Sequence, residues 1–339
     1  MASSRQEKQT CMLRANPSPP HLPPTKSLSN RHAKPTLLNQ TMANIASALI
    51  TALRPKQWTK NLLLFAGVIF SRHVTEADRL GRAAIAFCIF CCLSGVVYLV
   101  NDIADAEGDR QHPEKRNRPI ASGALPVPIA VAAALCLSAG GLSASYLLNI
   151  RFGILATTYV VMMLAYSLAL KHLVILDILI VALGFVMRGI GGIWAIELPG
   201  EKIPITPWFI TCILFLALFI ALCKRRHELL LLTEGAGNHR PVLNDYSHEL
   251  LDQMVSVATT ATIISYSLYV TLGVKPESAR HHDYMIYTLP FVVYGIFRYL
   301  YLVYKRDEGG APEVLLLKDV PMIVNILLWL ITVLVVFYW

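Results

Sequence analysis

The chain has 339 residues, of which 55% are hydrophobic and only 15% are charged. That composition excludes a water-soluble globular enzyme. The formal net charge of +8 indicates membrane topology rather than binding to nucleic acid, because long apolar segments separate the bases into short loops. No nucleic-acid partner is expected.

The N-terminal residues 1–41 are rich in Ser, Pro, Asn, Lys and Arg and show no apolar periodicity. Such a segment cannot bury enough apolar surface to fold, so a disordered tail is predicted. It has no apolar h-region and is not expected to be a signal peptide. A more regular segment opens at Met42, which leaves open whether Met42 is the true start. Residues 42–339 are predicted to form one membrane domain.

Apolar windows of about 19 residues recur along the chain, so we predict an all-α polytopic membrane protein with about nine transmembrane helices in one bundle. The segments are roughly 54–72, 82–103, 124–148, 151–170, 174–196, 206–223, 252–273, 283–304 and 320–338. The first is the weakest, because its apolar core is short and its start carries three bases. The connections are mostly short and leave no room for a separate soluble domain.

A polar stretch, residues 101–123, follows the second apolar segment, with acidic side chains first and basic ones after. On a continuing helix, Asn101, Asp105 and Asp109 lie at i, i+4 and i+8 on one face. Clustered carboxylates repel one another unless a cation lies between them, and Mg²⁺ commonly bridges carboxylates to substrate phosphates. The stretch therefore predicts a Mg²⁺ site at Asp102, Asp105 and Asp109, with Asn101 alongside.

Bases downstream of these acids are available to neutralise the phosphates of a substrate. They are Arg110, Lys115, Arg116 and Arg118. The alternative is a solvated loop that happens to be charged. The order of acids before bases, placed where an apolar helix ends, favours a functional site.

Other polar side chains gather at the ends of helices on the same membrane face. They are Lys56, Lys60, Tyr166, Lys171, Asp177, Lys224, Arg225, Glu228 and Arg298. Asp177 lies just inside the membrane region, where a carboxylate is costly and usually paired or functional. Arg188 lies about 16 Å deeper along the helix, and is either the partner of a buried acid or a phosphate ligand. The bases before the first helix, with Trp58 beside them, are either a phosphate site or a topology signal with an aromatic anchor.

The loops after the second, fourth, sixth and eighth helices carry more Lys and Arg than the opposite loops. By the positive-inside rule they are cytoplasmic, together with the N-terminus. Six of the seven cysteines lie in or at the ends of apolar helices. The pair Cys88 and Cys91 is therefore expected to be ordinary packing and not a metal or redox pair.

These residues resemble the UbiA superfamily of intramembrane prenyltransferases over about residues 50–339. The first signature of that superfamily, Asn-Asp-x-x-Asp-x-x-x-Asp, is complete here from Asn101 to Asp109. The motifs that begin at Arg54, Asp109, Tyr166 and Lys224 are similar to those of one branch, the decaprenyl-phosphate phosphoribosyltransferases. The resemblance implies a UbiA-like catalytic domain over residues 42–339, embedded in the cell membrane with its active site facing the cytoplasm.

The resemblance also implies Mg²⁺-dependent transfer of 5-phosphoribose from phosphoribosyl pyrophosphate to a polyprenyl phosphate, releasing pyrophosphate, in the synthesis of cell-envelope glycolipid precursors. The basic run from Arg110 to Arg118 would bind the diphosphate or the 5-phosphate of the donor. The candidates for the lipid phosphate are Lys56, Lys60, Lys171 and Arg298.

One departure concerns the second Asp-x-x-x-Asp motif that aromatic prenyltransferases carry after helix 6. This chain has Glu228, Asp245 and Glu249 there instead. The alternative enzyme is a prenyltransferase that moves a prenyl chain from its diphosphate to an aromatic or other acceptor. A transporter or lipid-binding protein is the alternative outside enzymes, and the one-sided placement of the acids argues against it.

Overall fold

The computed structural model describes residues 37–111, 115–233, 241–272, 282–306, 309, 310, 312, 315 and 318–338. The chain divides into two units, Met1–Thr41 and Met42–Trp339. Residues 1–36 of the predicted tail lie outside the described residues, and helix α1 begins at Leu37. The second unit contains all the long apolar helices of the described residues.

Eight helices of the described residues are long and apolar enough to cross a membrane, so the protein is a multi-pass membrane protein. They comprise α3 (Ala77–Ala104), α5 (Val127–Leu148), α6 (Ile150–Leu168), α7 (Leu176–Ile196), α8 (Pro207–Thr233), α9 (His248–Leu272), α10 (Leu289–Lys305) with the preceding 3₁₀ helix η5 (His282–Thr288), and α12 (Val320–Tyr338). The shorter elements are α1 (Leu37–Ala52), η1 (Pro55–Leu64), α2 (Phe65–Phe70), α4 (Ala106–Gln111), η2 (Lys115–Asn117), η3 (Leu170–His172) and η4 (Pro241–Asp245). The prediction of an all-α polytopic bundle is confirmed, and eight spanning helices are close to the nine expected.

The difference lies in the first predicted helix, residues 54–72. Arg54 has left-handed backbone angles (φ 53°, ψ 64°) and separates α1 from η1. Pro55–Leu64 then forms a 3₁₀ helix, and only Phe65–Phe70 is α-helical. Five polar side chains within residues 56–61 weaken the apolar signal, and η1 packs against both α7 and α3.

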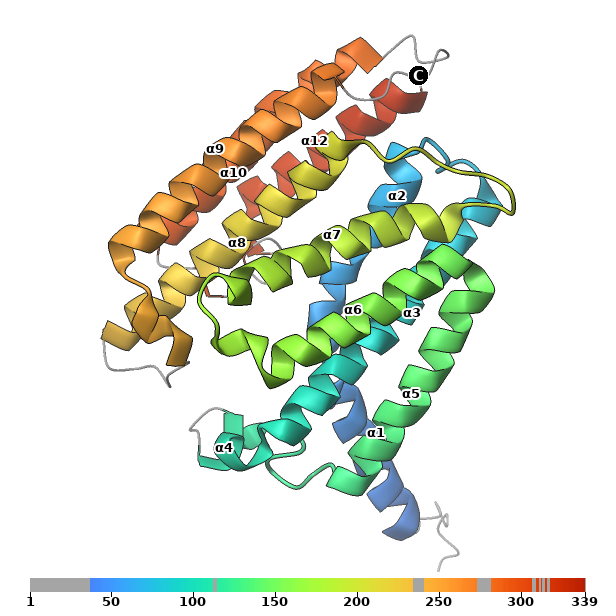
Figure 1. The fold of residues 1–339 in the computed structure, drawn as a ribbon, viewed down its shortest axis with the longest axis vertical. Helices are drawn as coiled ribbons and strands as arrows, with labels where there is room; N and C mark the ends of the chain where they lie inside the picture. Colours follow the sequence, from blue (N-terminus) through green and yellow to red (C-terminus); the bar gives the residue numbers. More distant parts are fainter. Residues whose placement is uncertain are drawn as a thin grey trace, which may run out of the picture. The chain divides into compact units, whose positions relative to one another are not determined.

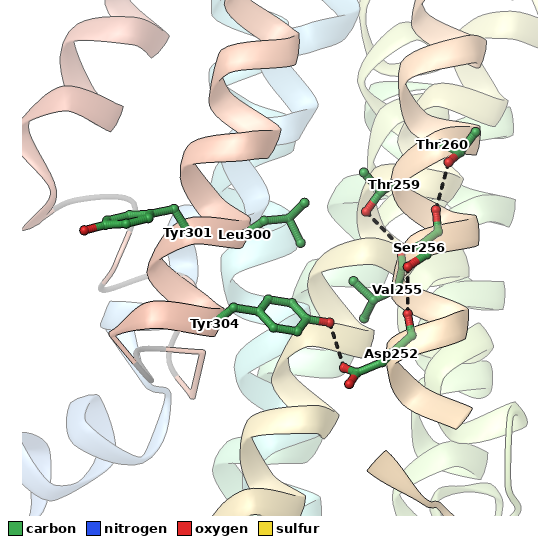
Figure 2. Close-up of a pocket in the computed structure, with 8 residues that line it drawn as sticks. All are labelled: Asp252, Val255, Ser256, Thr259, Thr260, Leu300, Tyr301 and Tyr304. Atoms are coloured by element: carbon green, nitrogen blue, oxygen red, sulfur yellow. Dashed lines mark hydrogen bonds between the residues drawn. The ribbon is translucent and has the colours of Figure 1, made fainter. Parts of the chain in front are cut away.

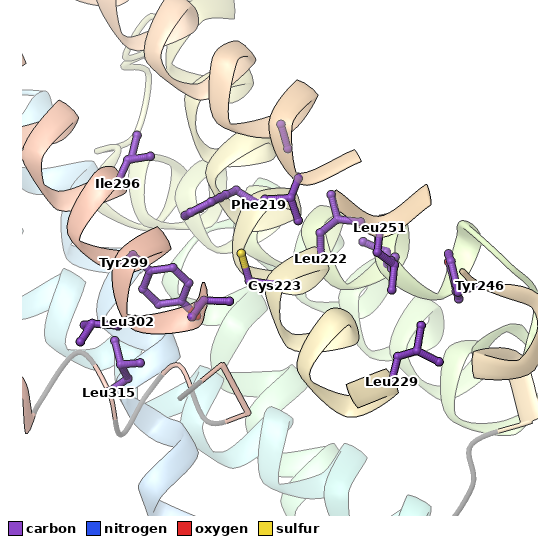
Figure 3. Close-up of a cluster of buried hydrophobic side chains, with 14 of the residues drawn as sticks. Phe219, Leu222, Cys223, Leu229, Tyr246, Leu251, Ile296, Tyr299, Leu302 and Leu315 are labelled. Carbon is purple, nitrogen blue, oxygen red and sulfur yellow. The ribbon is translucent and has the colours of Figure 1, made fainter. Parts of the chain in front are cut away.

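Helices adjacent in sequence pack against each other from α5 through α9, and α3 lies against α5, α6 and α7 (Figure 1). Aromatic side chains fill the interface of α3 and α6, where the Phe90 ring lies 5.1 Å from that of Tyr159. A second apolar cluster joins α8, α9 and α10 (Figure 3). In that cluster the rings of Phe219 and Tyr299 meet edge to face at 5.4 Å. These two clusters hold the helices that form the walls of the candidate site.

The chain from η1 to α2 crosses α7 with direct backbone contact. A Cβ atom on Gly192 would lie 2.0 Å from the carbonyl oxygen of Leu64. A Cβ atom on Gly67 would lie 2.3 Å from the carbonyl carbon of Gly192. Neither glycine can therefore carry a side chain unless the two segments move apart.

Candidate active site

The acidic motif lies where α3 passes into α4. The carboxylate of Asp102 is buried and accepts a hydrogen bond from Arg54 Nη2 at 2.6 Å. Arg118 Nη1 donates to Asp102 Oδ1 at 3.1 Å and to Asp109 Oδ2 at 2.7 Å. One guanidinium group therefore bridges two carboxylates of the motif.

Asp105 has a different partner and lies at the junction of two helices. Helix α3 ends at Ala104 and α4 begins at Ala106, so the continuing helix assumed from the sequence is broken at Asp105. The i, i+4 relation survives, and Asn101 Nδ2 donates to Asp105 Oδ2 at 3.0 Å. Lys171 Nζ reaches Asp105 Oδ1 at 3.1 Å from η3.

A cavity of about 550 Å³ lies between η1, α7 and α8. Its polar lining residues are Thr59, Lys60, Tyr166, Asp177, Lys224, Arg225 and Glu228. The rest of its described wall is apolar and includes Leu63, Val181, Phe185 and Ile213. A chamber that is charged at one end and apolar along its length fits a phosphate group attached to a hydrocarbon chain.

Arg225 is held at the polar end of this cavity by two carboxylates. Its Nε donates to Asp177 Oδ2 at 2.8 Å, and its Nη1 pairs with Glu228. Tyr246 donates from its hydroxyl to Asp177 Oδ1 at 2.8 Å, and the amide of Ile175 donates to that hydroxyl at 2.7 Å. Burial, with the Asp177 carboxylate as a further cause, raises the pKa of Tyr246 to about 12, so the hydroxyl keeps its proton and stays a donor.

The model of the UbiA prenyltransferase family matches residues 62–331. The chain belongs to this family.

Two relatives of known name match nearly the whole chain. Decaprenyl-phosphate phosphoribosyltransferase of Mycolicibacterium smegmatis is 34% identical over 302 residues, which cover 86% of this chain and 92% of that protein. The protein of the same name from Corynebacterium glutamicum is 34% identical over 304 residues, which cover 88% of this chain and 89% of that one. The resemblance inferred from the motifs is therefore confirmed.

A solved structure, a UbiA homologue from Archaeoglobus fulgidus bound to DMAPP and Mg²⁺, shares the fold. It superposes with a TM-score of 0.63 at 17% sequence identity, covering 85% of this chain and 98% of that one. At this identity the likeness shows the fold alone. The acidic motif and the cavity therefore lie within a UbiA fold.

The donor set of the acidic motif fits a divalent cation of the Mg²⁺ type. Two carboxylates, Asp102 and Asp109, already converge on one positively charged group, the guanidinium of Arg118. Carboxylate oxygens are the ligands that Mg²⁺ prefers. Within the part of the chain that the structure describes, however, no three His, Cys, Asp or Glu side chains converge closely enough to hold a metal ion. The third carboxylate of the motif, Asp105, is paired with Lys171 instead.

Several residues named from the sequence lie outside the cavity wall. Arg298 forms a two-bond pair with Asp319, at 3.1 and 2.8 Å. Lys56, Arg110 and Arg116 are exposed, and Lys115 is half-buried. The structure therefore divides the predicted set between the cavity, the acidic motif and the surface.

Arg188 is buried, and its partners are neutral. Its nitrogens donate to Asn61 Oδ1, the Gly184 carbonyl and the Tyr159 hydroxyl. The buried acid considered from the sequence is not found beside it among the described residues. Arg188 does not line the cavity, although Phe185, one turn away, does.

Sequence reasoning did not select Arg54, Thr59 or Tyr246 as site residues. Arg54 stood in a quoted motif, and its contact with Asp102 spans 48 residues, which no local pattern reveals. Tyr246 reaches Asp177 from 69 residues away. The sequence signal for Tyr246 was a tyrosine in a polar loop before a membrane helix. Many tyrosines that only anchor a helix at the membrane interface show the same pattern.

A second, more open groove lies between α9 and α10 (Figure 2). The hydroxyl of Tyr304 donates to Asp252 at 2.7 Å, and Arg226 Nε donates to the same carboxylate oxygen at 2.7 Å. No residue predicted as a site lines this groove. It is therefore not the candidate active site.

Proposed function

We propose that this protein transfers 5-phosphoribose from phosphoribosyl pyrophosphate to a polyprenyl phosphate of the decaprenyl type and releases pyrophosphate. The observation that carries the proposal is the cavity, whose charged end suits a phosphate and whose apolar walls suit a prenyl chain. The two relatives described above are named as phosphoribosyltransferases that act on decaprenyl phosphate, which supports the proposal.

The lipid tail is accommodated by an opening toward the membrane. Leu62 and Leu216 line the cavity, yet they are 53% and 42% exposed. The cavity is therefore open sideways between η1 and α8, toward the hydrocarbon of the bilayer. The first isoprene units would lie inside against Phe185 and Ile213, and the remaining tail would lie in the bilayer.

The lipid phosphate would bind at Lys60 and Lys224, beside the hydroxyl of Thr59 and the guanidinium of Arg225. All four line the polar end of the cavity. Hydrogen bonds from cationic groups to phosphate oxygens are roughly twice as strong as neutral ones. Lys56, Lys171 and Arg298 are weaker candidates, because none of them lies in the cavity wall.

The sugar diphosphate would bind at the acidic motif. Asp102, Asp105 and Asp109 would hold Mg²⁺, which supplies positive charge to the departing diphosphate. Arg118 would exchange its carboxylate partners for diphosphate oxygens, and Lys115 and Arg116 would neutralise the remaining charge. Tyr166 and Asp177 lie on the cavity side and would orient the groups between the two substrates.

In the reaction an oxygen of the lipid phosphate forms a bond to C1 of the ribose, and the bond from C1 to the diphosphate oxygen breaks. The electron pair of the broken bond leaves with pyrophosphate. The nucleophile is already ionised near neutral pH, so no general base is required. The work of the protein is alignment and electrostatic stabilisation of the leaving group.

The site would lie on the cytoplasmic face of the cell membrane, on the side where the water-soluble phosphoribosyl donor is made. The bias of Lys and Arg toward the loops on this side supports that orientation. The product, a lipid-linked pentose phosphate, would serve as a precursor of cell-envelope glycolipids.

Mass spectrometry of lipid products tests the function. Purified protein in detergent is supplied with Mg²⁺, phosphoribosyl pyrophosphate and decaprenyl phosphate, and a lipid heavier by one phosphoribosyl group is expected. A parallel reaction receives a prenyl diphosphate with an aromatic acid. Product in the second reaction only would establish the alternative, prenyl transfer to an aromatic acceptor, and overturn the proposal.

A further inference from the structure

The 3₁₀ helix η1 forms one wall of the cavity in a form that is rare at this length. It runs for ten residues, whereas 3₁₀ segments longer than three or four residues are uncommon. With three residues per turn, side chains three positions apart lie above one another. Thr59 with Leu62, and Lys60 with Leu63, form two such rows, and all four side chains line the cavity.

The third row of η1 faces the interior of the bundle. Asn61 and Leu64 have no exposed surface. The Oδ1 atom of Asn61 accepts a hydrogen bond from Arg188 Nε at 2.7 Å. Its Nδ2 atom donates to Ser94 Oγ at 3.2 Å. The Asn61 amide is thus held from two sides, by α7 and by α3.

Arg188 is a buried charge that the proposed reaction does not use. It donates to the carbonyl of Gly184 at 2.8 Å and to the hydroxyl of Tyr159 at 2.7 Å, and its guanidinium lies 4.9 Å from the centre of the Tyr159 ring. None of these partners is a carboxylate. A charge buried among neutral partners costs folding free energy that an apolar side chain would not, so packing alone does not account for an arginine here.

We propose that Arg188 is a positioning residue that holds η1 in its 3₁₀ form through Asn61, and so sets the direction from which Lys60 enters the cavity. The inference rests on the proposed function, in which Lys60 binds the lipid phosphate. A 3₁₀ helix turns about 120° per residue and an α-helix about 100°. Relaxation of η1 to an α-helix would turn Lys60, four residues from Leu64, by about 80° and carry its ammonium away from the cavity.

Substitutions at the two ends of the bond test the role. Arg188→Met removes the charge and the bond together. Because the oxygens of Asn61 and Tyr159 then lose a donor, the thermal midpoint in detergent is measured first to show that the variant is folded. We expect the Michaelis constant for decaprenyl phosphate to rise about tenfold or more, toward that of Lys60→Ala, while the constant for phosphoribosyl pyrophosphate stays within about twofold. Asn61→Leu should behave in the same way.

A rescue variant and a control separate positioning from general stability. Asn61→Asp keeps an oxygen for Arg188 Nε and should bind the lipid like the wild type. Thr158→Ala, on an exposed residue next to Tyr159, should change neither constant. Unchanged lipid constants in folded Arg188→Met and Asn61→Leu would overturn the proposal, and so would an equal rise in both constants.

A labelling experiment measures the position of η1 without turnover. Lys60→Cys is made in a chain whose seven cysteines are replaced. Cys91 becomes serine, because its sulfur accepts a hydrogen bond from Asn61 Nδ2, and the other six become alanine. The reaction of the new cysteine with a water-soluble maleimide is timed in detergent. Adding Arg188→Met should change the rate at position 60 at least about threefold, and leave the rate of Gln111→Cys on α4 unchanged. Equal rates at position 60 overturn the proposal. Absent turnover by the wild type would reject the proposed function, whereas the labelling result would still decide the role of Arg188.

Discussion

The ammonium of Lys171 lies 3.1 Å from Oδ1 and 3.2 Å from Oδ2 of Asp105, although 66 residues separate them. The Lys171 side chain is 13% exposed and that of Asp105 is 37% exposed. This contact joins the connection between α6 and α7 to the acidic motif, and it places a lysine where a divalent cation would bind Asp105.

Lys171 and Mg²⁺ should therefore compete for one carboxylate. A partly exposed ion pair is worth about 0.2–1 kcal/mol, which corresponds to a factor of about 1.4 to 5 in binding. Lys171→Met should lower the Mg²⁺ concentration for half-maximal activity by up to about fivefold. Mg²⁺ titration of initial rates measures the effect, with Lys305→Met, at the exposed end of α10, as the control. A higher Mg²⁺ requirement would contradict the competition.

The carboxylates of the acidic motif should be essential for turnover and dispensable for folding. Asp102→Asn or Asp105→Asn should reduce activity to background, because an amide is a poor ligand for Mg²⁺. Both variants should remain folded in detergent, although the thermal midpoint of Asp102→Asn should fall, because the buried carboxylate that pairs with Arg54 and Arg118 is lost. Glu107→Gln, at an exposed position of α4, should remain active. Full turnover by both asparagine variants in excess chelator would rule out a metal site here.

Arg118 and Lys60 should affect different substrates. Losing one charge-assisted bond costs roughly 1.5–3 kcal/mol, or about ten- to a hundredfold in affinity. Arg118→Ala should raise the Michaelis constant for phosphoribosyl pyrophosphate by that factor and leave the lipid constant little changed. Lys60→Ala should do the reverse. Initial rates with each substrate varied in turn test the assignment, which fails if Arg118→Ala weakens only the lipid.

The face that carries the acidic motif should be cytoplasmic. A cysteine introduced at Gln111, which is exposed at the end of α4, should react with a membrane-impermeant maleimide in inverted or opened vesicles. It should not react in intact cells. A variant without native cysteines provides the background, and labelling in intact cells would reverse the orientation.

The contact between Gly192 and Leu64 should make position 192 intolerant of any side chain. Gly192→Ala places a methyl group against a backbone oxygen, and overpacking of this kind costs typically about 1–3 kcal/mol, occasionally more. A lower thermal midpoint is expected. Gly140→Ala on α5 meets no atom within 4 Å, so the better helix propensity of alanine should raise stability by about 0.5–1 kcal/mol. Equal thermal midpoints for Gly192→Ala and Gly140→Ala would show that η1 and α7 can move apart without a loss of stability.

Hydropathy predicted the spanning helices well, because each needs a run of apolar residues long enough to cross the membrane. It was least informative before Phe65, where Arg54 takes left-handed backbone angles and a 3₁₀ helix replaces the expected α-helix. This segment and α2 pack against α7, as at Gly67 and Gly192, and contacts between residues so far apart in sequence are not visible in local hydropathy.

The candidate site was predictable where local spacing carried the signal. Asn101 and Asp105 are hydrogen-bonded at i, i+4 as expected. The partners of Lys171 and Arg298 were not predictable. Lys171 lies in the short η3 between two helices and Arg298 lies inside α10. Whether such a base contacts a substrate or a carboxylate depends on the packing of whole helices. Arg298 forms an ion pair with Asp319, 21 residues away.

The hydrogen bond between Arg188 and Asn61 joins two segments that are synthesised at different times. The two residues are 127 positions apart, and translation at about 5–20 residues per second leaves roughly 6–25 seconds between their appearances at the ribosome. During that interval Asn61 Oδ1 lacks its donor on Arg188, and the contact between Gly67 and Gly192 is unmade. The contacts of η1 with α7 can therefore form only after α7 has been synthesised, so the wall of the cavity that is made first is completed late.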